Sequence, residues 1–172
     1  MKKILAMLLV TILALSATAF AATYRHDDDI VFEYDENAIE ITAEVHNEDE
    51  HRIVMGYKDK AWGDGYITIQ VVDLPDGQGF PTREELAESM GTTADAFEDM
   101  PTWGNFKDVV TTSTTTEGLT ETVFIAPVTD DDGEVEDILT VIIATSEVED
   151  EEAAQNRDDA ISAIVDTLKV DD

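Results

Sequence analysis

The chain has 172 residues, of which 40 are Asp or Glu and 10 are Lys or Arg, so its formal net charge at pH 7 is −30. Such a charge repels nucleic-acid phosphates and anionic membrane surfaces, which excludes nucleic acid as an expected partner and leaves cationic partners or divalent cations compatible. The chain contains no cysteine, which excludes disulfides, zinc–thiolate sites and thiol nucleophiles.

Residues 1–21 have the pattern of a secretory signal peptide. Lys2 and Lys3 precede the apolar run ILAMLLVTILALSATAF, and Ala19-Phe20-Ala21 is a small-x-small cleavage pattern. The apolar run is short for a membrane span, which needs about 20 residues. We therefore expect a secreted or extracytoplasmic mature chain, residues 22–172, that has no lipid-anchor cysteine and no membrane insertion and forms a single domain.

The first half of the mature chain alternates apolar and polar residues, as half-buried strands do. A polar lead-in at 22–29, which we expect to be mobile, comes before this pattern. Short polar joints separate the predicted strands, which favours antiparallel neighbours. These strands are expected at 30–34, 38–45, 52–58 and 65–73.

A helical section follows the fourth predicted strand. Thr82 and Glu85 form a capping box in PTREELAESMG, and Gly91 is placed to end that helix. The stretch TTADAFEDM at 92–100 predicts a second short helix, stopped by Pro101.

Strands then resume, and the chain closes with a long helix. Runs rich in β-branched residues predict strands at 106–116, 119–128 and 135–145. A helix is predicted at 146–170, opened by a capping box of Ser146 and Glu149. One stripe at helical spacing gives it a face for the sheet: Ala154, Arg157, Ile161, Ile164, Val165 and Leu168.

This order predicts the α+β class, with an antiparallel sheet of about seven strands, a helical section after the fourth strand and a long C-terminal helix packed on the sheet. The segments FEYDENAIEIT, YITIQVVDLP followed by TREELAE, and DDAISAIVDTLKV resemble the PsbP-like superfamily of extracytoplasmic accessory proteins. The resemblance lies in layout and apolar pattern and covers nearly all of the mature chain. It implies a non-catalytic binding or assembly role. This chain differs from that family in its acidity and in having no lipid-anchor cysteine.

The acidic stretch VTDDDGEVED at 128–137 has two interpretations. Counted from Asp130 as an EF-hand loop, Gly133 falls at position 4 instead of 6, and Val141 stands where the bidentate Glu belongs. Strand-like runs on both sides and the Asp-Gly pair predict a hairpin turn. Calcium binding by Asp130, Asp132 and Glu134 is the alternative, because a turn can point several carboxylates at one place.

The histidines are the other candidate metal ligands. If a four-residue loop joined the second and third strands, His46 would face His51 and a Zn²⁺ or Cu²⁺ clip would be feasible. The apolar match favours another register, with Val45 opposite Ile53 and His46 opposite Arg52. His26, before three aspartates, resembles a chelating tail only loosely.

Trp62 and Trp103 each stand in a glycine-flanked loop, where an aromatic side chain can bind a ligand or plug the end of the core. No nucleophile motif is present, and no histidine stands beside a plausible nucleophile. We therefore expect a non-enzymatic binding or accessory protein without a cofactor, whose partner, protein or small molecule, and oligomeric state the sequence does not identify. An acidic protein that binds calcium with low affinity is the second hypothesis, and a small extracytoplasmic enzyme is the third.

Overall fold

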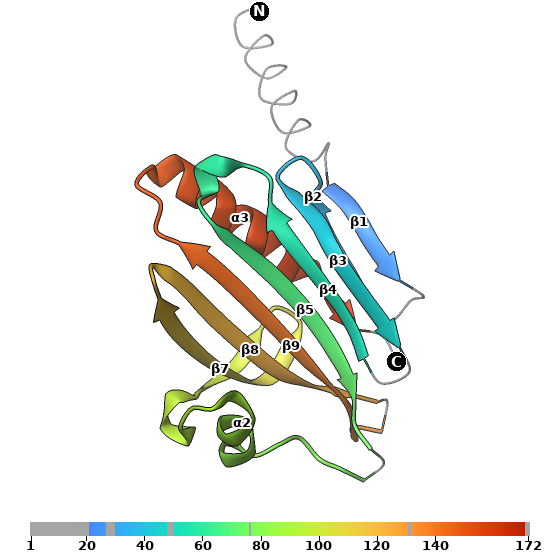
Figure 1. Ribbon diagram of the computed structural model, residues 1–172. Coiled ribbons are helices and arrows are strands. Elements are labelled where there is room, and N and C mark those ends of the chain that lie inside the picture. Colours follow the sequence, from blue (N-terminus) through green and yellow to red (C-terminus); the bar gives the residue numbers. More distant parts are fainter. Residues whose placement is uncertain (1–20, 27–29, 48–49, 76, 131, 171–172) are drawn as a thin grey trace, which may run out of the picture.

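The computed structural model describes residues 21–26, 30–47, 50–75, 77–130 and 132–170, and the signal-peptide prediction therefore falls almost entirely outside the described residues. The described chain forms two antiparallel sheets and two α-helices (Figure 1), which confirms the α+β prediction. The larger sheet has the strand order β3-β4-β5-β9-β8-β7-β6, and the smaller has the order β1-β2-β10.

The bounds of the elements, in chain order, are β1 Ala21–His26, β2 Ile30–Asp35, β3 Ile39–Asn47, β4 Glu50–Tyr57, the 3₁₀ turn η1 Lys60–Trp62, β5 Gly65–Asp73, α2 Arg83–Met90, the 3₁₀ turn η2 Ala94–Ala96, β6 Glu98–Trp103, β7 Phe106–Thr116, β8 Leu119–Thr129, β9 Val135–Ser146, α3 Glu151–Thr167 and β10 Lys169–Val170.

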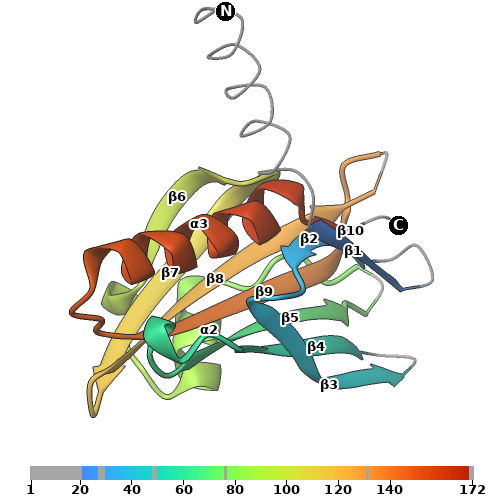
Figure 2. The same ribbon diagram turned by 90° about the horizontal axis from the view of Figure 1, so that it is seen from above.

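The seven-stranded sheet separates two layers (Figure 2). Its inner face carries the main core and is covered by α3 and the small sheet, with α3 residues Ile161 and Ile164 packed among Phe32, Ile53 and Ile69. Its outer face carries a second, smaller cluster, which is covered by α2. Successive side chains of a strand point to opposite faces, so each strand has side chains on the inner and on the outer face.

The capping box of α2 is confirmed, because the Thr82 hydroxyl accepts from the Glu85 N–H at 3.3 Å and the Glu85 carboxylate accepts from the Thr82 N–H at 2.8 Å. Gly91 ends this helix with a φ of 67°. The Thr82 N–H and the Thr82 hydroxyl, which donates to the same carboxylate at 2.9 Å, lower the pKa of Glu85.

The long helix α3 begins later than predicted. Ser146 does not cap it, because the Ser146 N–H donates to the Asp64 carbonyl at 2.9 Å at the end of β9. Asp150 is the cap instead, and its carboxylate accepts from the N–H groups of Glu152 and Ala153. The apolar stripe is confirmed at its centre, where Arg157, Ile161 and Ile164 are buried.

Two segments differ from the prediction. Residues 22–26 of the expected mobile lead-in belong to β1, because they pair with β2 and the Tyr24 ring stacks on Phe32 at 4.9 Å. The helix expected at 92–100 is only the turn η2, and β6 follows it. Pro101 fits there because β6 is an edge strand, where a missing N–H costs no ladder bond.

The predicted register of β3 against β4 is wrong. The structure pairs Val45 with Arg52 and not with Ile53, and it sets His46 opposite His51. The ladder extends further than predicted, because Asn47 pairs with Glu50, and a β-bulge shifts the register by one residue between Ile41 and Ala43.

The bulge residue is Thr42, whose hydroxyl donates to the Val54 carbonyl at 3.1 Å. Before the bulge Ile39 and Ile41 face the core, as predicted. After it Ala43 and Val45 turn to the outer face. One inserted residue has therefore moved two apolar side chains from the core side to the exposed side.

Candidate functional site

Helix α2 covers only part of the outer face. Leu86 and Ala87 pack in one cluster with Val110, Val123 and Ile125 of β7 and β8. In Figure 2, α2 lies below the sheet and does not reach under the outermost strands β3 and β4. Part of the outer face is therefore left without a covering element among the described residues.

A row of side chains, apolar except for one threonine, runs from the covered part of this face to the uncovered part. Each member is the cross-strand partner of the next, and the row crosses β8, β9, β5, β4 and β3. We call this the middle row, and its members are Val123, Ile142, Thr68, Val54 and Ala43.

Beyond α2, the middle row forms the floor of an open hollow of about 260 Å³. We call this surface the open face; its lining residues are Ala43, Glu44, Val45, Arg52, Val54, Tyr66, Thr68, Gln70 and Ile142. Among the described residues, the large hydrophobic side chains that are exposed are Val45, which is 37% exposed, and Met90 of α2, which is 42% exposed. Val45 lines the open face, and Met90 belongs to the helix on the same side of the sheet.

Tyr66 and Glu121 lie between the open face and a second hollow, because Tyr66 lines the first and Glu121 lines the second. They are the partners of Ala144 on either side of β9, and the Tyr66 hydroxyl donates to the Glu121 carboxylate across that small side chain. This hydrogen bond, helped by burial and by the charge of Glu121, raises the pKa of Tyr66 to about 12. The phenol is therefore held in one orientation at the border of the open face.

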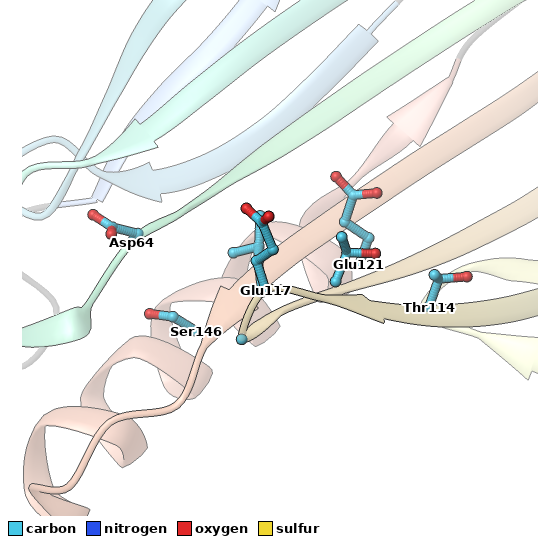
Figure 3. A pocket seen from close by; sticks show the side chains of 8 residues that line it. Asp64, Thr114, Glu117, Glu121 and Ser146 are labelled. Carbon is cyan, nitrogen blue, oxygen red and sulfur yellow. The ribbon is translucent and has the colours of Figure 1, made fainter.

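A second hollow, of about 520 Å³, lies beyond Glu121 at the end of the β7–β8 hairpin. Figure 3 shows the Glu117 and Glu121 carboxylates extending to the same side of the sheet, with Asp64 supplied by the segment before β5. We call it the acidic hollow; its lining residues are Asp64, Thr114, Thr116, Glu117, Gly118, Leu119, Glu121 and Ser146. It offers carboxylate and hydroxyl acceptors, a set suited to ammonium or guanidinium groups.

The opposite border of the open face carries a cation that is already engaged. Arg52 Nε lies 3.4 Å from Glu50 Oε1, and Gln70 Nε2 donates to the same oxygen at 3.1 Å. The open face therefore has an apolar floor, a neutralised charge pair on one border and carboxylates on the other.

The predicted acidic stretch is the turn of the β8–β9 hairpin. The Gly133 N–H donates to the Asp130 carbonyl at 3.1 Å, and the Asp130 carboxylate accepts from the Glu134 N–H at 2.7 Å. Gly133 has a φ of 84°, as such a turn requires. Asp132 is exposed, and Asp131 lies outside the described residues.

The two tryptophans lie away from the open face. Trp62 is 5% exposed and belongs to the main core, where its ring meets Tyr57 edge-on at 5.9 Å. The buried Arg157 donates to the Trp62 carbonyl at 3.4 Å. Trp103 is half-buried at the end of β6 and stacks on Phe124 at 4.2 Å.

The structure brings His46 and His51 together, with ring centroids 5.1 Å apart. His51 is 6% exposed, and its Nε2 lies 3.4 Å from the Tyr24 hydroxyl and 3.6 Å from Glu44 Oε1. The Tyr24 hydroxyl donates to that carboxylate at 2.7 Å, and burial together with this bond raises the pKa of Tyr24.

These contacts connect β1 to β3 and β4. Within the ranges that the structure describes, no group of three or more His, Cys, Asp or Glu side chains is arranged to hold a metal ion. The side chain of His26 is outside the described part of the chain.

Comparison with known proteins adds no family. No protein-family model matches the chain, and no curated protein matches it. A crystal structure of a Bacteroides thetaiotaomicron protein aligns with 84% of this chain, with a TM-score of 0.47 and 13% sequence identity. The present chain spans less than half of that protein, 46% of its length.

No helix among the described residues has both the length and the apolar character needed to cross a membrane.

The open face was not found by sequence reasoning. The sequence does contain one local indication of this face, because Tyr66, Thr68 and Gln70 alternate with the buried Ile67 and Ile69 along β5. That alternation shows which side of β5 is uncovered. It does not show that β9 and β8 are the next strands, which is what brings Glu121 to Tyr66.

Proposed function

We propose that the protein is a secreted, non-enzymatic binding or accessory module, and that the open face is where its partner binds. The observation that carries this proposal is the middle row, which continues from beneath α2 onto an uncovered part of the sheet. A domain gains by covering such a row, and here the cluster under α2 includes Val123 and, in part, Ile142, but not Val54 or Ala43. The resemblance to PsbP-like accessory proteins supports the same role.

The arrangement of side chains supports binding in preference to catalysis. The Tyr66–Glu121 pair, the Arg52–Glu50 pair and the apolar floor give fixed polar groups around an apolar centre, as binding surfaces commonly do. The buried His51 contacts Tyr24 and Glu44 and is not itself a lining residue of the open face.

The test is capture of partners from the extracytoplasmic fraction of the producing cells. The bait is compared with Val45→Thr/Val54→Thr, which removes apolar surface while keeping shape and β-branching. Val31→Thr/Val135→Thr is the matched control, because these half-buried strand valines do not line the open face. We expect a partner that the wild-type and control baits retain and the open-face variant loses.

Identical capture by all three baits would contradict the proposal. Calorimetric titration with calcium tests the alternative. A saturable site of micromolar affinity that disappears in Asp130→Asn/Asp132→Asn would place cation binding ahead of partner binding.

A further inference from the structure

The uncovered part of the middle row has room for one short helix. From Ile142 to Ala43 the row crosses the four neighbouring strands β9, β5, β4 and β3. Strands spaced about 4.8 Å apart make this strip about 14 Å long. A helix advances about 5.4 Å per turn, so two to three turns with apolar residues on one side would cover the strip.

The chain itself shows that a helix packs on this face. Leu86 and Ala87 of α2 cover Val123, the member of the row next to Ile142, and they also contact the cluster around Ile125. The same face, one strand further on, has the same apolar floor without a helix over it.

The charges on the border favour an occupant that carries positive charge. Asp64, Glu117 and Glu121 line the acidic hollow, and none of its lining residues is Lys, Arg or His. The cation of the open face, Arg52, already has Glu50 as its partner. Lysine or arginine side chains on one border of a docked helix would therefore meet three carboxylates through charge-assisted hydrogen bonds.

We infer that the open face and the acidic hollow together dock a basic amphipathic helix from a partner protein. The apolar side of that helix lies over Val45, Val54 and Ile142, and its cations reach Glu121 and the hollow behind it. The inference rests on the proposed function and adds the chemistry of the partner. A second copy of this chain is disfavoured as the occupant, because each copy has a net charge of −30.

The experiment uses two synthetic helical peptides with the same leucine positions, one with lysines on the borders of the leucine stripe and one with glutamates there. Binding to the full mature protein is measured by fluorescence anisotropy at physiological salt. The protein variants are Val45→Thr/Val54→Thr and Glu121→Gln. Their matched controls are Val31→Thr/Val135→Thr and Glu98→Gln, the latter an exposed glutamate on β6, at the opposite edge of the sheet from β3.

We expect saturable binding of the lysine peptide. The double Thr variant should weaken it about tenfold, because two buried methyl groups are lost from the contact. Glu121→Gln should weaken it about two- to fivefold, as expected for one partly exposed charge pair. Glu98→Gln and the valine control should leave the affinity unchanged.

Equal weakening by Glu98→Gln and Glu121→Gln would show diffuse attraction to the acidic surface and would overturn the inference. Equal binding of the glutamate peptide would overturn the basic character of the partner while the docking face stands. Failure of the lysine peptide, beside partner capture that depends on Val45 and Val54, would refute the basic helix and leave the proposed function intact. Self-association that the double Thr variant abolishes would assign the open face to a second copy and would also overturn it.

Discussion

Replacing Ile164 with Ala tests whether α3 is part of the core. Ile164 is 1% exposed and lies in the main cluster between α3, β2 and the inner face of the sheet. Removing a buried aliphatic side chain down to Ala costs about 2–5 kcal/mol, through lost transfer free energy and the cavity left behind. The better helix propensity of Ala returns a few tenths of a kcal/mol. We therefore expect the free energy of unfolding to fall by about 3 kcal/mol.

The assay is urea unfolding of residues 22–172, followed by far-UV circular dichroism. Ser162→Ala is the control, because Ser162 is an exposed residue of the same helix and the substitution brings the same gain in propensity. We expect Ser162→Ala to change stability by less than about 0.5 kcal/mol. A loss of similar size for both variants, or little loss for either, would refute the packing of α3 against the sheet.

Gly133→Val should destabilise the protein by about 1 kcal/mol or more in the same assay. The cost comes from the backbone φ of 84° and not from a clash, since nothing lies within 4 Å of the added Cβ. Asp132→Asn in that turn should leave stability unchanged or slightly higher, and equal effects of the two substitutions would contradict the turn geometry. For Tyr66 the pKa of about 12 lies above the usual 10.0, so its contribution to stability is complete below pH 10 and is lost as pH rises towards 12. Glu121→Gln should lower the pKa of Tyr66, as followed by NMR of labelled tyrosine, and an unmoved titration would disprove the pairing. Added neutral salt should raise the melting temperature, because it screens repulsion within a chain of net charge −30 over distances of about 8 Å; a flat or falling melting temperature would show that the acidic residues are already compensated.

Local signals in the sequence predicted the features that depend on neighbours along the chain. The capping box of Thr82 and Glu85 and the left-handed Gly91 are formed within one helix, so three or four residues specify them. The hairpin at Gly133 is local for the same reason. The sequence predicts a helix start at Ser146, because Ser146 satisfies a helix-capping pattern. In the structure Ser146 ends β9, where its N–H donates to the carbonyl of Asp64, a residue remote in sequence.

The bulge at Thr42 shows where the alternation pattern fails. Ile39, Ile41, Ala43 and Val45 form an unbroken apolar alternation, and a regular strand would place all four on one face. A bulge inserts one residue and reverses the side for everything after it. The sequence contains no glycine or proline that marks this position, so the exposure of Val45 could not be derived from the pattern.

The existence of an open face, as distinct from its position, follows from the lengths of the elements. Seven strands about 4.8 Å apart make a sheet about 29 Å wide. The 17 residues of α3 extend about 25 Å, and with β1, β2 and β10 they cover the inner face. The 8 residues of α2 extend only about 12 Å, less than half of that width, whatever the direction of the helix. The outer face must therefore remain partly uncovered by helix. Its position beside β3 and β4 is set by the contacts of Leu86 and Ala87 with β7 and β8, a pairing of distant segments that local periodicity does not encode.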